Sequence, residues 1–258
     1  MLISITNKCR MNCPHCLDDA LPDNEDFMSF ETFLHAIDFN NKYEVLNHIM
    51  ITGGEPTEHP DFWKFLGYLV ETARPSTIIT VTSNGMNFDK DDGTILKGIL
   101  SLSKTAAERM CHLMFQITSV PDLYPYQIDL DNDIFSLDNF VICREIEAMY
   151  PQGRALQGDF EFKTNGPKCF NIRSYVNSER NIGLKDVLLF LRKSLKFCNP
   201  HINFDGSIGL GEGRLCPSVG TIFDSEQTII DNIRNCKCQQ CKISFEKLTP
   251  LHLKAIGL

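Results

Sequence analysis

The chain has 258 residues, of which 43% are hydrophobic and 18 are Phe, and its formal net charge is −8. This composition can bury a substantial core and excludes a low-complexity or disordered chain. The longest apolar runs are about five residues, short of the roughly 20 that a bilayer needs, so no membrane span is expected. An acidic chain without a long Lys/Arg run is not expected to bind nucleic acid through bulk charge.

The first 165 residues alternate β-branched runs with amphipathic helical patterns. Strands are predicted at residues 2–6, 48–52, 77–82, 113–118, 140–143 and 160–162, and helices at residues 30–39, 61–73 and 94–109. Prolines and an acidic run predict a loop over residues 121–133. This alternation favours a parallel sheet, and about six strands are too few for an eight-fold barrel. We therefore expect an α/β fold, a partial (β/α) barrel.

The last third of the chain has a different pattern of predicted elements. A helix is predicted at 184–197, a β-hairpin at 201–210 with Asp205-Gly206 as its turn, and short helices at 228–234 and 245–256. Three parts are thus expected: the partial barrel over 1–165, a connecting segment and helix over 166–197, and a small Cys-rich hairpin and helix module over 198–258.

The chain carries 11 cysteines, and it starts without the basic and apolar segments of a secretory leader, which predicts a cytoplasmic protein. Clustered cysteines in a reducing compartment bind metal or do redox chemistry rather than forming disulfides. Cys9, Cys13 and Cys16 form a C-x3-C-x2-C motif. Three soft thiolates can hold three irons of a [4Fe–4S] cluster and leave the fourth iron open for chemistry. Structural zinc with His15 as fourth ligand is the alternative, disfavoured because His15 lies between two of the thiols.

Each distinctive loop of the first half follows a predicted strand. The cysteine motif follows the first strand, Gly53-Gly54-Glu55-Pro56 the second, Ser83-Asn84 the third and Ser119 the fourth. The carboxyl ends of parallel strands meet at one face of such folds. We therefore expect these loops to form one site.

The segment from Cys9 to Cys16 resembles the signature of the radical S-adenosylmethionine (SAM) superfamily, with His15 in the place of an aromatic residue. The segment from Ile51 to Pro56 resembles the family's second motif, which binds the methionine amino group. The resemblance covers roughly residues 1–165. It implies a [4Fe–4S] cluster with an open iron, S-adenosyl-L-methionine as cofactor, reductive cleavage to a 5′-deoxyadenosyl radical and hydrogen abstraction from a substrate. A flavodoxin- or ferredoxin-type electron donor is implied as well.

The resemblance also suggests which residues meet the cofactor. Glu55 would accept from the methionine ammonium, Gly53 and Gly54 would let the backbone approach the cofactor, and Arg144 would pair with the methionine carboxylate. The full expected set is His15, Gly53, Gly54, Glu55, Pro56, Ser83, Asn84, Gln116, Thr118, Ser119 and Arg144, with the hydroxyl and amide residues near the ribose. Two alternatives stay open: Ser83-Asn84-Gly85 is also a good turn, and Arg144 is also readable as a surface charge.

The tail cysteines resemble the ligands of the auxiliary modules called SPASM and twitch. The expected ligands of one auxiliary [4Fe–4S] cluster, serving electron transfer, are Cys198, Cys216, Cys238 and Cys241, with Cys236 as an alternative to Cys238. The five tail cysteines favour the shorter twitch form, and the stretch over residues 150–155 resembles the same group. A zinc ribbon on the same four cysteines is the alternative. Packing is the default role for Cys111, Cys143 and Cys169.

The resemblance implies modification of a peptide, by RiPP-type crosslinking, epimerisation or oxidation. The chain starts directly at its first strand, without a peptide-recognition domain. This favours the alternative of a small hydroxylated metabolite of the aminocyclitol or sugar type, or a peptide delivered by a partner. A non-catalytic iron–sulfur electron carrier is a further alternative, disfavoured because such a carrier has no use for Gly53-Gly54-Glu55-Pro56.

Overall fold

The computed structural model describes residues 1–43, 47–90, 93–145, 153–158, 172–178, 181–194, 200–210 and 217–235. In these ranges the strands are β1 (Leu2–Ser4), β2 (His48–Thr52), β3 (Ile78–Ser83), β4 (His112–Thr118), β5 (Phe140–Cys143), β6 (His201–Ile202) and β7 (Ile208–Gly209). The helices are α1 (Phe30–Tyr43), α2 (Phe62–Thr72), α3 (Met86–Asp89), α4 (Thr94–Glu108), α5 (Ile172–Ser178), α6 (Leu184–Ser194) and α7 (Glu226–Asn235). Short 3-10 turns are η1 (Pro56–Glu58), η2 (Asp133–Ser136) and η3 (Gly153–Gln157).

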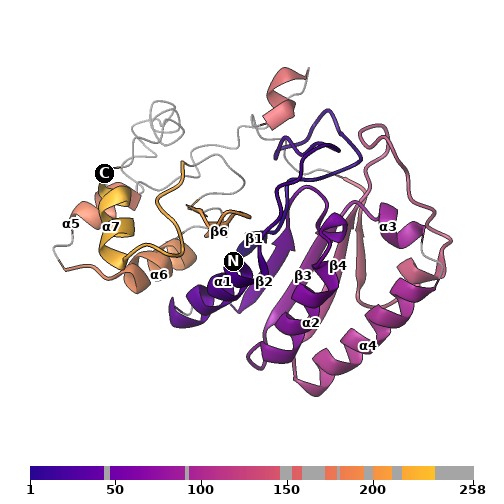
Figure 1. Cartoon of the computed structure of the whole chain (residues 1–258), viewed down its shortest axis with the longest axis horizontal. Helices are drawn as coiled ribbons and strands as arrows, with labels where there is room; N and C mark the ends of the chain where they lie inside the picture. Colours follow the sequence, from indigo (N-terminus) through magenta and orange to yellow (C-terminus); the bar gives the residue numbers. More distant parts are fainter. Residues whose placement is uncertain are drawn as a thin grey trace.

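The strands form one mostly parallel sheet in the order β5-β4-β3-β2-β1-β6-β7. Strands β1 to β6 pair in parallel, and only β7 runs antiparallel among the strands of the described ranges. In Figure 1 the helices α1, α2 and α4 lie along the central strands, while α5, α6 and α7 gather beyond β6. The expected α/β partial barrel of about six parallel strands is confirmed, and the sheet is not closed.

The core lies between the sheet and the helices packed on it. Ile51, Val81 and Phe115 of the central strands have no exposed surface. The apolar stripe of α2 faces them, and Phe65 stacks on Phe33 of α1 with ring centroids 4.5 Å apart. Burying one such side chain contributes about 1.5–3 kcal/mol, so this stripe accounts for the position of α2.

Most predicted elements are present with shifted ends. Strand β2 has the predicted bounds, and the predicted helix 61–73 begins and ends one residue inside them. β1 is shorter than predicted and ends at Ser4, although the Ile5 N–H still donates to the Thr52 carbonyl at 3.0 Å. α1 is longer than predicted, and the short helix α3 was not predicted. The predicted strand 160–162 and helix 245–256 lie outside the described residues.

The predicted hairpin around Asp205-Gly206 is present and belongs to the main sheet. Leu2 pairs with His201 and Ile3 with Ile202, so β6 extends the sheet beyond β1. The helix α7 that follows packs against α5 and α6. The boundary expected at residue 198 therefore falls between α6 and a strand of the same sheet as β1.

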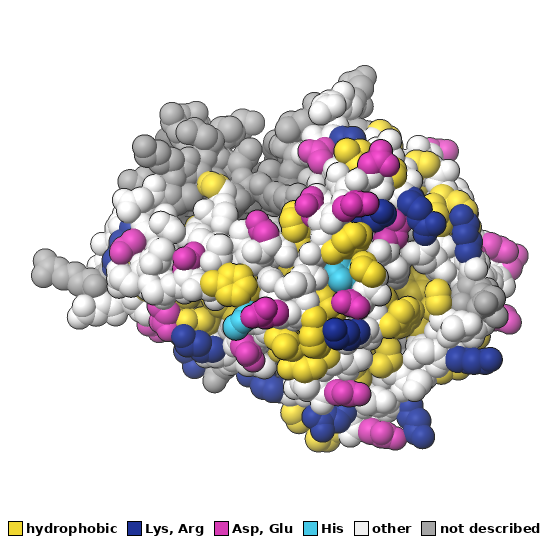
Figure 2. Space-filling model, viewed as in Figure 1, with side chains coloured by type: hydrophobic (Ala, Val, Ile, Leu, Met, Phe, Trp, Pro, Cys, Tyr) yellow, Lys and Arg dark blue, Asp and Glu magenta, His cyan; other side chains and the backbone are white. Residues whose placement is uncertain are grey.

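No described helix has the length and apolar character needed to cross a membrane. Figure 2 shows acidic and basic side chains interspersed over the face seen in Figure 1. On that face, neither sign of charge gathers into one large field.

Candidate functional site

The carboxyl edge of the sheet carries a cavity of about 260 Å³. It is bounded by the loop after β1, the ends of β2, β3 and β4, and the turn η3. Its lining residues are Cys9, Met11, Cys13, His15, Cys16, Leu17, Asp18, Thr52, Gly53, Gly54, Thr82, Ser83, Asn84, Thr118, Tyr124 and Arg154. The loops that follow the first four strands thus meet at one place.

The three thiols of the C-x3-C-x2-C motif line this cavity together. Cys9 and Cys13 are buried and Cys16 is half-buried. Burial raises the pKa of Cys9 to about 11 and that of Cys13 to about 12. The carboxylates of Glu55 and Glu58 add to the rise at Cys9, and the neighbouring thiols add to the rise at Cys13. The Asn84 amide contacts the Cys9 sulfur at 3.7 Å. Grouped thiolates of this kind are stable when cations such as iron lie among them.

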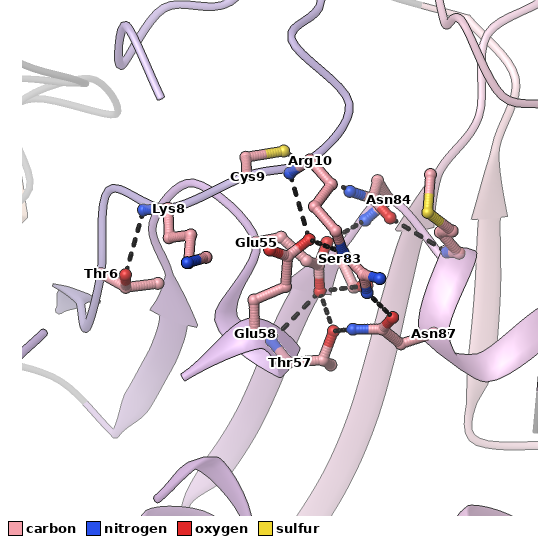
Figure 3. Close-up of polar contacts among 11 residues, drawn as sticks. Thr6, Lys8, Cys9, Arg10, Glu55, Thr57, Glu58, Ser83, Asn84 and Asn87 are labelled. Carbon is pink, nitrogen blue, oxygen red and sulfur yellow. Dashed lines mark hydrogen bonds and ion pairs between the residues drawn. The ribbon is translucent and has the colours of Figure 1, made fainter. Parts of the chain in front are cut away.

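We call residues 7–20, which carry these thiols, the cluster loop. It has no regular strand or helix, and hydrogen bonds to other segments hold it. The Cys9 N–H donates to the Leu21 carbonyl at 3.1 Å. The Arg10 backbone N–H and its Nε both donate to Oε1 of Glu58, at 3.1 and 3.0 Å (Figure 3). The position of the thiols therefore depends on contacts made from η1 as well as on the loop itself.

Gly53 and Gly54 bring the loop after β2 against the cluster loop. A Cβ on Gly53, whose φ is +144°, would lie 2.3 Å from the Thr6 carbonyl oxygen, and a Cβ on Gly54 would lie 2.3 Å from that of Lys8. The Gly54 N–H donates to the Thr6 carbonyl at 2.8 Å. The expected close approach of these glycines to the cofactor stays a prediction from the sequence. Both glycines line the cavity, and both also allow a close approach to the protein backbone of Thr6 and Lys8.

Glu55 lies at the centre of a buried hydrogen-bond network (Figure 3). Its Oε1 accepts from the Ser83 hydroxyl at 2.8 Å and from the backbone and hydroxyl of Thr57, and its Oε2 accepts from the Asn84 N–H at 2.8 Å. Burial raises its pKa, and the donated bonds oppose that rise. Glu55 is not among the residues that line the cavity, and its contact with a methionine ammonium stays a prediction from the sequence. The carboxylate joins the loops after β2 and β3.

Ser83-Asn84-Gly85 is both a turn and part of the cavity wall. The Gly85 N–H donates to the Ser83 hydroxyl at 3.0 Å, and the Met86 N–H donates to the Asn84 side-chain oxygen at 2.9 Å. Gly85 has φ of +82°, a region that favours glycine, and it begins α3. The two interpretations of this tripeptide are therefore compatible.

Of the remaining residues predicted to meet the cofactor, one lines the cavity and four do not. Thr118, at the end of β4, lines the cavity. Gln116, Ser119, Arg144 and Pro56 do not. Ser119 is buried and its hydroxyl points to the Gln127 amide oxygen at 3.5 Å, and Arg144 is exposed after β5. The exposed position of Arg144 agrees with its interpretation as a surface charge.

Some lining residues were not predicted to meet the cofactor. They are Met11, Leu17, Asp18, Thr52, Thr82, Tyr124 and Arg154. The Tyr124 ring lies 4.7 Å from that of His15. An aromatic residue in the loop after a predicted strand was the available signal for Tyr124. Arg154 stands in the stretch 150–155 noted in the sequence, but no cofactor role was assigned to it.

Several buried polar atoms in the cavity lining lack a hydrogen-bond partner among the described residues, which suits a polar ligand. Three buried polar atoms of its lining residues have no hydrogen-bond partner in the described protein, namely His15 Nδ1, Thr82 Oγ1 and Arg154 Nη1. Buried polar groups are normally paired, so such atoms call for a bound group. Within the same ranges, no three His, Cys, Asp or Glu side chains lie close enough to hold a single metal ion. Three soft thiolates around one cavity fit an iron–sulfur cluster.

The tail cysteines Cys198, Cys216, Cys236, Cys238 and Cys241 lie outside the described residues, as does Cys169. Cys111 is buried, as predicted, with its sulfur 3.3 Å from the Arg74 carbonyl oxygen. Cys143, at the end of β5, is only half-buried. The auxiliary ligand set thus stays a prediction from the sequence.

An open α/β barrel with a three-thiol cavity at its carboxyl edge defines the class of protein. Residues 3–125, just under half of the chain, match the family model described as the radical SAM superfamily. A tungsten-containing aldehyde ferredoxin oxidoreductase cofactor-modifying protein from Pyrococcus furiosus is 29% identical over 86 residues. Those residues are 33% of this chain and 23% of the relative, so the match spans about a quarter of the relative's length.

One solved structure shows the same fold at low identity. The structure of BtrN in complex with AdoMet and 2-DOIA has a TM-score of 0.52 and 11% identity, with 94% of this chain and 85% of that chain covered. Native anSMEcpe with bound AdoMet has a TM-score of 0.44 and 13% identity, with 95% and 83% covered. At 11% identity, the likeness to the BtrN structure concerns the fold alone.

Proposed function

We propose that this chain is a radical SAM enzyme that holds a [4Fe–4S] cluster through Cys9, Cys13 and Cys16. One observation carries the proposal: the three thiols line the same cavity as the loops after β2 and β3. When bound, the cluster supplies the electron that cleaves S-adenosylmethionine to a 5′-deoxyadenosyl radical, which abstracts hydrogen from a substrate.

The chain's own residues would bind and shield the reacting groups. The three thiolates hold iron, and the Asn84 amide donates toward the Cys9 sulfur. Thr82 Oγ1 and His15 Nδ1 are placed to meet polar groups of the cofactor, since both atoms are buried at the cavity without a partner in the described protein. The His15 and Tyr124 rings lie 4.7 Å apart in the cavity lining, where they would help to shield a bound cofactor from water.

A second cluster completes the proposal. We assign Cys198, Cys216, Cys238 and Cys241 as its ligands on sequence alone, with a flavodoxin- or ferredoxin-type protein as electron donor in the cytoplasm. Four protein thiolates would close this cluster and suit it to electron transfer.

Metal content tests both assignments. Iron, sulfide and zinc would be measured after anaerobic reconstitution of the wild type and of the C9A/C13A/C16A variant. About eight irons falling to about four supports two clusters, with one on the tail. About four irons falling to none, with about one zinc retained, rejects the auxiliary cluster and leaves a zinc ribbon.

Product analysis separates an enzyme from an electron carrier. The reduced wild type is expected to release 5′-deoxyadenosine from S-adenosylmethionine, and C9A/C13A/C16A is not. A reconstituted wild type that reduces fully but yields no 5′-deoxyadenosine would instead be an iron–sulfur electron carrier.

For the substrate we propose a peptide, as the family resemblance implies. A small hydroxylated metabolite is the second candidate, and the structure of BtrN with 2-DOIA, which shares the fold, favours it. The rate of 5′-deoxyadenosine release would be compared in the presence of short peptides and of aminocyclitols. Stimulation by the aminocyclitols alone would replace the peptide proposal.

A further inference from the structure

One arginine reaches the cavity from beyond the segment that matches the family. Arg154 lies in η3, and its guanidinium binds two carbonyl oxygens of the cluster loop. Its Nε donates to the Cys13 oxygen at 3.1 Å and its Nη2 donates to the Ala20 oxygen at 2.8 Å. These two carbonyls lie on either side of Cys16 in the sequence, so one planar group ties both flanks of the third thiol.

The neighbouring glycine shows that this contact is closely fitted. Gly153 has φ of +57°, and a Cβ there would lie 2.6 Å from the carbonyl oxygens of both Cys16 and Leu17. A larger residue would push η3 off the cluster loop. Arg154 therefore bonds to the loop backbone at two positions and Gly153 leaves no room for a side chain against it, and in Figure 1 η3 lies next to the cluster loop above the sheet.

The third nitrogen of the guanidinium is free for a bound group. Nη1 is buried, has no partner in the part of the chain that the structure describes, and belongs to a residue that lines the cavity with the three thiols. Arginine keeps its charge at all ordinary pH values. This fixed positive charge lies beside the Cys13 backbone and lines the same cavity as the three thiols.

We propose that Arg154 is a positioning residue for the iron–sulfur cluster: its two carbonyl contacts hold the cluster loop, and its charge makes the cluster easier to reduce. The inference rests on the proposed function, because it requires a [4Fe–4S] cluster in this cavity. Reduction adds one negative charge, and a fixed positive charge in a buried site stabilises that form. A residue with only a structural role would not change the reduction potential in this way.

Three full-length variants separate charge from geometry. R154Q removes the charge, R154K keeps the charge without the planar fork, and R109Q removes a charge from an exposed arginine before β4, at the opposite edge of the sheet. Each would be reconstituted anaerobically and titrated with reductant. The readout is the electron paramagnetic resonance signal of the reduced cluster that changes on addition of S-adenosylmethionine. Release of iron to a chelator would be timed in parallel.

At the wild-type midpoint potential, the fraction of reduced cluster is expected to be roughly threefold lower in R154Q, while in R109Q it stays at the wild-type value. R154K is expected to keep the wild-type potential and to release iron several-fold faster. Loss of the cluster from R154Q, with circular dichroism of the apoprotein unchanged, also supports the holding role. If R154Q misfolds, the iron release of R154K decides the question.

An R154Q potential equal to that of the wild type overturns the effect of charge, and R154K iron release at the wild-type rate overturns the holding role. Either result leaves the proposed function standing. A wild type without any signal sensitive to S-adenosylmethionine would instead reject the proposed function.

Discussion

Two loops form facing parts of the cavity, and they are held in different ways. The cluster loop, residues 7–20, depends on segments far away in the sequence: Gly54, Glu58 and Arg154 all bond to it or to the residue before it. The turn Ser83-Asn84-Gly85 also has bonds of its own, because both side chains accept from backbone N–H groups two residues ahead, and Glu55 supplies the bonds from outside it. The ligand-bearing loop is therefore the part most exposed to distant substitutions.

The buried carboxylate of Glu55 joins the two loops. It accepts from Ser83 and Asn84 on one side and belongs to the segment that pairs with the cluster loop on the other. Substitutions at the residues that join the loops should therefore lower the unfolding free energy more than substitutions at exposed contacts. Four predictions test that ranking, in order of decreasing expected effect.

The largest effect is expected for Gly54→Ala. The new Cβ would lie 2.3 Å from the Lys8 carbonyl oxygen, which is backbone and has little freedom to move. We expect a loss of about 3 kcal/mol in unfolding free energy, measured by urea denaturation of the reduced apoprotein. The control is Gly67→Ala in α2, where a Cβ meets nothing within 4 Å and a gain of about 0.5–1 kcal/mol is expected. Equal effects of the two changes would contradict the close approach.

Glu55→Gln should come next. The amide keeps the shape but replaces a charged acceptor by a weaker one and aims a donor at groups that already donate. A loss of about 2 kcal/mol is expected in the same denaturation assay. Glu71→Gln, an exposed change at the end of α2, should stay within about 0.5 kcal/mol. If the two variants were equally stable, the joining role of Glu55 would be wrong.

The third prediction concerns pH. His59 is buried at the start of α2; its Nε2 bonds to the Met28 carbonyl at 2.9 Å and its Nδ1 accepts from the Asp61 N–H at 3.0 Å. Burial lowers its pKa, and protonation would remove the acceptor at Nδ1. The folded pKa lies below the unfolded value of about 6.5, so the stabilisation is present above that pH and is lost as pH falls through the folded pKa.

Melting temperatures between pH 7.5 and 5 would measure this loss. His15 and His48 shift in the same direction, so only part of the slope belongs to His59. H59Q should therefore show a shallower decline than the wild type. An unchanged slope would exclude His59 as a contributor.

The smallest effect is expected at the ion pair between Arg10 and Glu58, 3.0 Å apart. The Arg10 side chain is 52% exposed, so water screens the pair. A double-mutant cycle with R10Q and E58Q should give a coupling of about 0.5 kcal/mol. The control is the exposed pair of Lys104 and Glu108, 4.0 Å apart on α4, where about 0.3 kcal/mol or less is expected. A coupling larger than the loss of about 2 kcal/mol expected for Glu55→Gln would reverse the ranking.

Much of the fold was predictable because its signals are local. Apolar residues at helical spacing place α2 within one residue of its predicted ends, and a β-branched run places β3. The end of β1 was not predictable, because Ile5 keeps a sheet-like bond to Thr52 while Thr6 pairs with Phe27. The bond from β6 to β1 joins residues about 200 positions apart, which no local pattern encodes.

The candidate site, like the fold, was predictable only where its signals are local in the sequence. The sequence by itself determined the C-x3-C-x2-C thiols, the glycine pair after β2 and the Ser83-Asn84-Gly85 turn, because each depends on spacing along a few residues and on the rule that parallel strands end at one edge. Only the tertiary structure decided that Glu55 joins two loops, that Gly54 makes room for the Lys8 carbonyl, and that Arg154 ties the flanks of Cys16. The physical reason is that a buried polar group takes whichever partners the packed chain brings to it.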